Sequence, residues 1–119
     1  GRFVMISAIG ADPNSESTRI QHYLRAKGVA DGYLRSSGLD YTILAPGTLL
    51  DEKGSGRIQA AEELGFHGFL PREDLAVCII ETLRNFYTLG KTIEIVSGAD
   101  KIKDAIVEVA GGGDLPPIL

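Results

Sequence analysis

Two short apolar segments enclose a long stretch with helical periodicity, and this pattern constrains the fold more than any other feature of the chain. Residues 3–6 and 41–44 are rich in strand formers, and residues 16–36 between them end shortly before Gly38, a common C-terminal signal of a helix. A strand, a long helix and a strand joined by short connections make a βαβ unit, with parallel strands and a right-handed crossover. We therefore expect a parallel sheet with flanking helices.

The second half of the chain continues this alternation. Pro71 precedes a segment with acidic residues in its first turn, which predicts a helix start. Apolar side chains recur there at helical spacing and predict a buried stripe: Leu75, Ala76, Ile79, Ile80 and Leu83. Residues 92–96 predict a third strand, and residues 101–109 predict a weaker helix. The fold class is therefore α/β.

The expected boundaries leave one irregular segment and one tail. Residues 49–70 lack a clear period, although residues 57–60 are a candidate short strand. Three consecutive glycines lead into a Pro-containing terminus, so we expect one domain over residues 1–110 and a flexible tail over residues 111–119. The first strand, at residues 3–6, would have an open edge. We expect that edge to be covered by an upstream half of the fold, a second copy of the chain, or another subunit.

Composition excludes several classes of function. The 119 residues carry a net charge of −4 and no basic cluster, so no nucleic-acid footprint is present. No apolar stretch reaches membrane-spanning length, and no signal-peptide pattern occurs. Cys78 is the single cysteine and cannot form an internal disulfide, so we expect a cytoplasmic protein. His22 and His67 have no metal-ligand spacing with each other or with Cys78, and we expect no metal site.

Tyr23 and Lys27 form the one pair in the chain with an evident chemical use. They are four residues apart on the expected first helix, so their side chains share a face. A nearby ammonium favours the phenolate and lowers the pKa of a tyrosine, which suits a general acid/base. The alternative is that Tyr23 packs on the sheet while Lys27 is a solvated helix residue, since such pairs are common on helices.

The order of these residues resembles the short-chain dehydrogenase/reductase superfamily. The resemblance is closest to its atypical branch of NAD(P)-dependent epimerase/dehydratases and NmrA-like proteins. Five segments carry it, in family order and over nearly the whole chain: residues 5–11, 23–31, 37–47, 72–76 and 90–98. The resemblance implies a Rossmann-like sheet, but only the C-terminal half of one.

The resemblance implies catalytic roles for three residues. Tyr23 corresponds to the acid/base that exchanges a proton with a substrate hydroxyl or carbonyl. Lys27 corresponds to the lysine that holds the nicotinamide ribose and lowers the tyrosine pKa. Ser7 corresponds to a serine that orients the substrate oxygen, although it is equally well explained as a polar strand end. Many relatives have a second serine where Ala8 stands, so the position of the active hydroxyl is left open.

The resemblance also implies that Pro46, Gly47 and Thr48 lie beneath the nicotinamide, whose carboxamide meets the backbone of Gly47 or Thr48. A plain strand-ending turn explains the same residues. Many relatives carry arginine where Ala45 stands, which removes a phosphate or substrate contact. Atypical members also often lose catalysis and keep only dinucleotide binding.

The Gly-rich turn that binds a dinucleotide pyrophosphate does not occur in this sequence. Binding of NAD or NADP is therefore expected to require the missing N-terminal half. The complete protein would be an oxidoreductase, or a sugar- or nucleotide-sugar-type epimerase/dehydratase, acting on a small hydroxyl or carbonyl substrate. The alternatives are a non-catalytic NmrA-like NAD(P) sensor or protein-interaction module, and a structural subunit that completes another protein's sheet.

Gly28 and Gly32 stand four residues apart on the expected first helix. Each costs about 1 kcal/mol relative to alanine in a helix. Close approach of another helix would compensate, and in this superfamily the equivalent helix often lies in a dimer interface. A homo-oligomer and a simply tolerated cost are both open.

Overall fold

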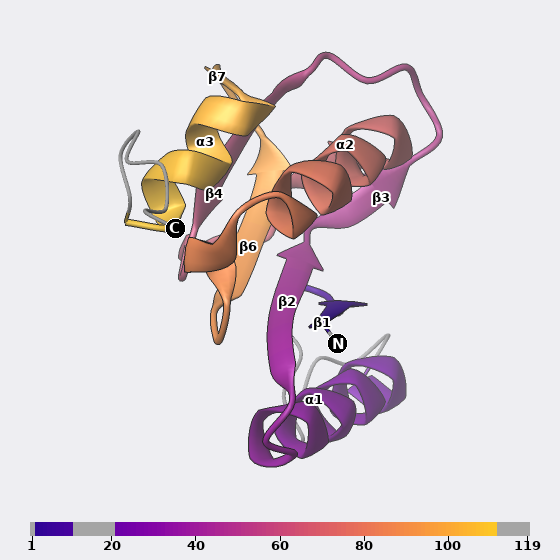
Figure 1. The fold of residues 1–119 in the computed structure, drawn as a ribbon. Coiled ribbons are helices and arrows are strands. Elements are labelled where there is room, and N and C mark those ends of the chain that lie inside the picture. The colour runs from indigo at the N-terminus through magenta and orange to yellow at the C-terminus, as the bar shows by residue number, and fades with distance from the viewer. Residues whose placement is uncertain (1, 11–20, 112–119) are drawn as a thin grey trace.

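The computed structural model describes residues 2–10 and 21–111, with the side chains of residues 2 and 21–23 left outside this description. The elements follow one another in this order: β1 (Arg2–Ile6), α1 (Gln21–Ser36), β2 (Asp40–Pro46), β3 (Thr48–Leu50), β4 (Arg57–Ala61), β5 (Phe69–Pro71), α2 (Arg72–Leu83), the 3₁₀ turn η1 (Phe86–Thr88), β6 (Thr92–Ser97), β7 (Asp100–Lys101) and α3 (Ile102–Val109). The expected α/β class is confirmed (Figure 1).

The main sheet has five strands in the order β1-β2-β6-β4-β7. Strands β1, β2 and β6 are parallel, as expected, whereas β4 runs antiparallel to both β6 and β7. The sheet is therefore mixed rather than built from parallel strands alone. Among the described residues β1 pairs only with β2, so its outer edge is open there, as predicted.

Residues 49–70 are more regular than expected. The candidate strand at residues 57–60 is confirmed as β4, but β3 and β5 were missed. These two three-residue strands pair in parallel as a separate small sheet, with Thr48 opposite Phe69. Segments this short carry no readable period, because only contact with each other makes them strands.

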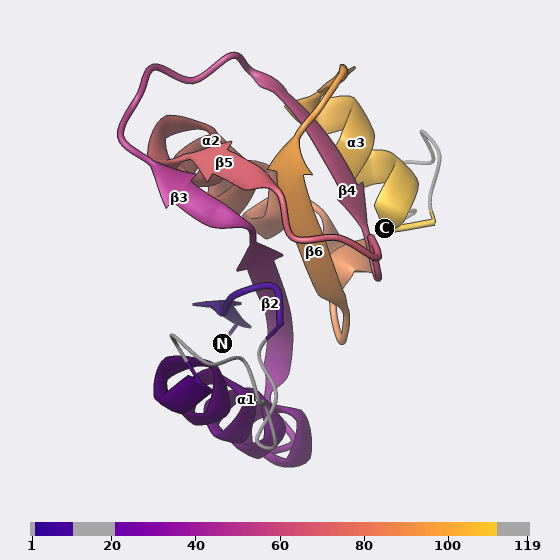
Figure 2. The same ribbon diagram turned by 180° about the vertical axis from the view of Figure 1, so that it is seen from behind.

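The main core lies between the sheet and the two later helices. Figures 1 and 2 show α2 and α3 side by side on one face of β6 and β4, with α1 apart from them at the β1 and β2 end. Buried side chains from both layers form this core: Leu44, Ile58, Leu70, Leu75, Cys78, Ile93, Ile95, Ile102, Ala105 and Ile106. The alternation along β6 sends Val96 instead to a smaller cluster with Ile9 and Ala45.

Three of the five residues predicted for the buried stripe of α2 are exposed: Ala76, Ile80 (48%) and Leu83 (50%). Leu75 is buried and Ile79 packs against the core, as predicted, together with Cys78. A helix that is apolar on most of its surface does not reveal from its sequence which side faces the sheet.

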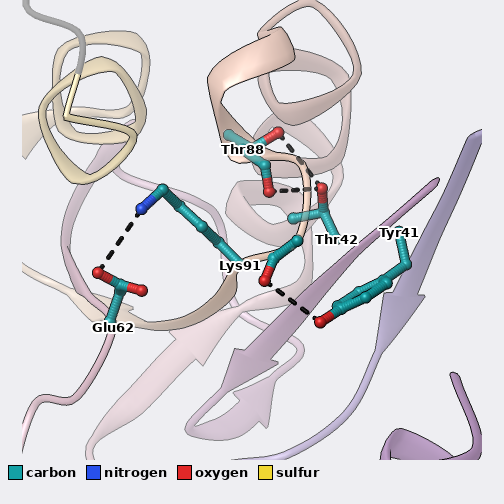
Figure 3. A network of polar contacts seen from close by, with 6 residues as sticks. Tyr41, Thr42, Glu62, Thr88 and Lys91 are labelled. Atoms are coloured by element: carbon teal, nitrogen blue, oxygen red, sulfur yellow. Dashed lines mark hydrogen bonds and ion pairs between the residues drawn. The ribbon is translucent and has the colours of Figure 1, made fainter. Parts of the chain in front are cut away.

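A buried threonine pair secures the start of β2 against the turn before β6. Thr42 Oγ1 donates to the Thr88 carbonyl at 2.9 Å and lies 3.3 Å from Thr88 Oγ1 (Figure 3). The Tyr41 hydroxyl donates to the Gly90 carbonyl at 3.3 Å, and Lys91 lies 3.7 Å from the Glu62 carboxylate. These contacts lie at the amino ends of two neighbouring parallel strands, opposite to their carboxyl ends.

The ends of the described elements agree with the expected signals. α1 ends at Ser36, and Gly38 has a φ of +78°, the left-handed conformation expected after a helix. The expected start of this helix at residue 16 lies outside the described residues, as does most of the predicted tail. Among the described residues, no helix combines the length and the apolar character that crossing a membrane requires.

Candidate functional site

The candidate site lies where β1 and β2 end. The Ser7 amide donates to the Leu44 carbonyl at 2.8 Å, and the Ile9 amide donates to the Pro46 carbonyl at 2.9 Å. Pairing therefore continues past Ile6, and the segment after β1 runs beside the end of β2. The carboxyl ends of neighbouring parallel strands are where ligands bind in open α/β sheets.

Lys27 reaches this end of β1 from α1. Its Nζ donates to the Ile6 carbonyl oxygen at 2.8 Å, and the side chain is partly buried. Tyr23 lies one turn earlier on the same helix, but its side chain is outside the described part of the chain. The backbone thus places the two residues on one face of α1, while the contact between their side chains stays a prediction.

Ser7 directs its hydroxyl toward α1. Ser7 Oγ donates to Asp31 Oδ2 at 2.6 Å, and the two residues are only 2% and 3% exposed. A serine hydroxyl has one hydrogen, so this bond leaves Ser7 only acceptor lone pairs for any other group. Its predicted role in orienting a substrate oxygen stays a prediction, restricted to accepting a hydrogen bond.

Gly47 allows two backbone segments to approach closely. A Cβ built at Gly47 would lie 2.5 Å from the Gly68 carbonyl oxygen. The Gly47 amide donates to the Ile95 carbonyl at 3.0 Å, and the Thr48 amide donates to the Gly68 carbonyl at 3.0 Å. Because both N–H groups are used within the fold, a carboxamide could meet this backbone only at a carbonyl oxygen.

Thr48 carries the one exposed side chain among the three residues after Ala45. Its hydroxyl lies 3.0 Å from His67 Nε2, whereas Pro46 and Gly47 are buried. From the sequence, His67 was considered only as a metal ligand and excluded. The structure places it beside a predicted cofactor-binding residue that is 19 residues away in sequence. No local pattern could have indicated that pairing.

Asp31 is the second polar residue that the sequence prediction missed. A signal was present, because Asp31 follows Lys27 by four residues and so shares the face of Tyr23 and Lys27. Its depth of burial depends on how α1 packs, which the helical period alone does not determine.

Asp51 and Cys78 are two further titratable groups. Asp51 forms an ion pair with Arg72 at 2.7 Å, and both side chains are largely exposed. Cys78 is buried, and burial together with the charge of Asp74 raises the pKa of its thiol to about 12. Within the described ranges, no group of three or more histidine, cysteine or acidic side chains could hold a metal ion.

This edge carries two polar groups, the Lys27 ammonium and the exposed Thr48 hydroxyl. Both are able to donate hydrogen bonds to oxygen acceptors. The described residues include no Gly-rich turn before a helix, so no described feature of this chain would hold a pyrophosphate.

The chain is similar to known NAD(P)H-binding proteins. The family model for NAD(P)H-binding matches residues 1–86. The uncharacterized sugar epimerase YhfK of Bacillus subtilis is 36% identical over 106 residues, which cover 88% of this chain and 49% of YhfK. The chain therefore spans about half the length of the curated relatives it matches.

Two solved structures are similar throughout. One is a protein of Bacillus halodurans, provisionally assigned as an NAD-dependent epimerase/dehydratase, with a TM-score of 0.83 and 34% identity. The alignment covers 89% of this chain and 50% of that one. The other is the oxidoreductase ylbE of Lactococcus lactis, with a TM-score of 0.81, 28% identity, and coverage of 96% and 54%. The fold is thus Rossmann-like, in a chain half as long as these neighbours.

Proposed function

Because this chain belongs to the NAD(P)H-binding family, we propose that it supplies the substrate-side half of an NAD(P)-dependent oxidoreductase or epimerase/dehydratase. The observation that supports the proposal is that Lys27 bonds the last residue of β1, while Thr48 follows the end of the neighbouring parallel strand β2. The substrate class is a small molecule with a hydroxyl or carbonyl group. A nicotinamide cofactor would supply hydride transfer when bound.

The residues of this chain would handle the proton and the orientation of the cofactor. Tyr23 would exchange a proton with the substrate oxygen, and the Lys27 ammonium would favour its phenolate. Lys27 would also meet the ribose, because its ammonium has three N–H donors and the bond to the Ile6 carbonyl uses one of them. Pro46 and Gly47 would form the rigid floor, with Thr48 at its exposed end.

Binding of NAD or NADP would require a second polypeptide segment that carries the Gly-rich turn. The test is a chimera in which this chain follows the N-terminal half of the Bacillus subtilis relative. We expect NADPH titrated into the chimera to show fluorescence enhancement, and the isolated chain to show none. Absence of binding by a folded chimera would contradict the proposed cofactor role.

Catalysis is tested on the same chimera with a panel of small carbonyl compounds. We expect Tyr23→Phe to abolish NADPH oxidation while leaving NADPH affinity within about twofold, because general acid/base catalysis supplies roughly 10²–10⁴-fold of rate. Tyr33→Phe is the matched control, since Tyr33 is 77% exposed on the same helix. Equal turnover by the Tyr23 variant and the parent would remove the role assigned to Tyr23.

A second candidate is an NAD(P) sensor without turnover. Two observations favour it: the Ser7 hydrogen is committed to Asp31, and Ala8 offers no second hydroxyl. NADPH binding without oxidation across the carbonyl panel would support the sensor over the enzyme.

A further inference from the structure

A buried carboxylate joins the end of β1 to α1 beside the proposed site. Asp31 is 3% exposed and accepts the hydroxyl hydrogen of Ser7 at 2.6 Å. Within the described residues its other oxygen, Oδ1, has no hydrogen-bond partner. A buried carboxylate with a single donor is a poor source of stability, because one hydrogen bond does not repay its desolvation. Its place in the fold therefore calls for another explanation.

The contact has a neighbour one turn earlier. Lys27 Nζ donates to the carbonyl of Ile6, the residue before Ser7. Consecutive residues at the end of β1 are thus held by consecutive turns of α1, through Lys27 and Asp31. Tyr23 precedes Lys27 by another turn on the same face. Two attachments along one face restrict rotation of a helix about its axis, which a single attachment does not.

We propose that Asp31 is a positioning residue. With Ser7 it forms a buried brace that sets the rotation of α1 against β1 and so directs the face bearing Lys27 and Tyr23 toward the carboxyl end of the sheet. The same bond keeps the Ser7 hydrogen from being donated to a substrate oxygen. The brace itself is independent of the proposed function, whereas its effect on cofactor binding rests on that function.

The brace is tested first on the chain alone, by hydrogen exchange of the α1 amides in a double-mutant cycle. We expect Ser7→Ala and Asp31→Ala each to accelerate exchange roughly tenfold, and the double variant to exchange no faster than the faster single variant. Asp31→Asn keeps an acceptor for Ser7 and is expected to exchange within about threefold of the parent. Additive effects, or no effect of Asp31→Ala, would overturn the brace.

The second test uses the chimera described above, with NADPH as the probe. We expect Ser7→Ala and Asp31→Ala to weaken NADPH binding by the same factor and to lower turnover at saturating NADPH by the same factor, because the brace positions both Lys27 and Tyr23. Asp31→Asn should restore both. A serine that contacts the substrate predicts a different result: Ser7→Ala would lower turnover with NADPH affinity intact, and Asp31→Ala would change neither. If the parent chimera binds no NADPH, the proposed function fails, and the exchange experiment still decides the brace.

Discussion

Any side chain at Gly47 would collide with neighbouring backbone atoms. A methyl group there would meet backbone oxygen rather than a mobile side chain, so the clash cannot be relieved by a change of rotamer. We expect Gly47→Ala to lower the free energy of unfolding by about 1–3 kcal/mol, measured by urea denaturation.

Gly32 provides the matched control. A Cβ at Gly32 would have no neighbour within 4 Å among the described residues, and Gly32 lies inside α1. Gly32→Ala is expected to stabilise the chain by roughly 0.5–1 kcal/mol. A loss of stability in this variant, accompanied by a fall in molecular mass in solution, would instead indicate that another copy of the chain packs against α1.

Cys78 makes stability depend on pH in the alkaline range. Its pKa is raised from 9.0 to about 12, because burial disfavours the thiolate and the Asp74 charge adds to the effect. The contribution of this thiol to the free energy of unfolding is fully present below pH 9. It is lost as the pH rises toward 12, because between these values the thiol ionises only in the unfolded state. As the pH rises from 9 to 12, we expect the free energy of unfolding of the parent to fall faster than that of Cys78→Ala, by up to about 1.4 kcal/mol per pH unit. Equal pH dependence of the two proteins would contradict the raised pKa of Cys78.

The residue types of the site could be recognised from sequence, but their contacts could not. Lys27 was identified by its spacing from Tyr23, which is a local property of a helix. Ser7 and Asp31 are 24 residues apart, and their bond exists only because α1 packs across the end of β1. The restriction of Ser7 to accepting hydrogen bonds follows from that packing.

At the scale of elements, the start of α2 holds the loop between β3 and β4. Asp74 is 2% exposed and accepts hydrogen bonds from the amides of Ser55 at 3.1 Å and Gly56 at 2.9 Å. Glu73 accepts from the Gly54 amide at 2.8 Å but is exposed. The acidic pair that marked a helix start in the sequence therefore also fixes the preceding loop.

We expect Asp74→Ala to destabilise the chain by about 1–3 kcal/mol, because it breaks two partly buried hydrogen bonds that hold the loop. Glu73→Ala is the control, and the loss should be smaller because water can replace an exposed carboxylate. Thermal unfolding followed by circular dichroism measures both variants. Equal losses would show that the acidic residues act only through the helix dipole.

At the scale of the whole molecule, an open strand edge lies near an exposed apolar helix surface. The outer edge of β1 is open within the described residues, and α2 exposes apolar side chains on the sector turned away from the core: Ala76, Val77, Ile80 and Leu83. Contacts of α2 reach both β1 and β2, so this helix lies near the open edge. A helix that is apolar on both sides is normally buried on both.

We expect the polypeptide that supplies the N-terminal half of the fold to cover both surfaces. Ile80→Lys together with Leu83→Lys should abolish formation of a 1:1 complex between this chain and the separately expressed N-terminal half of the Bacillus subtilis relative. Leu39→Lys is the control, because Leu39 is 47% exposed in the turn after α1. Light scattering after size exclusion gives the masses. A complex that survives the paired lysines would place the partner elsewhere.

The sequence alone determined the elements whose cause is local. Apolar runs, a helical period and glycine after a helix predicted β1, α1, β2, α2, β6 and α3, because propensity and patterning act over a few neighbouring residues. Only the tertiary structure decided the antiparallel place of β4, the small β3-β5 sheet, the exposed side of α2 and the bond between Ser7 and Asp31. These features depend on contacts between segments far apart in the chain, and such contacts leave no period in the sequence.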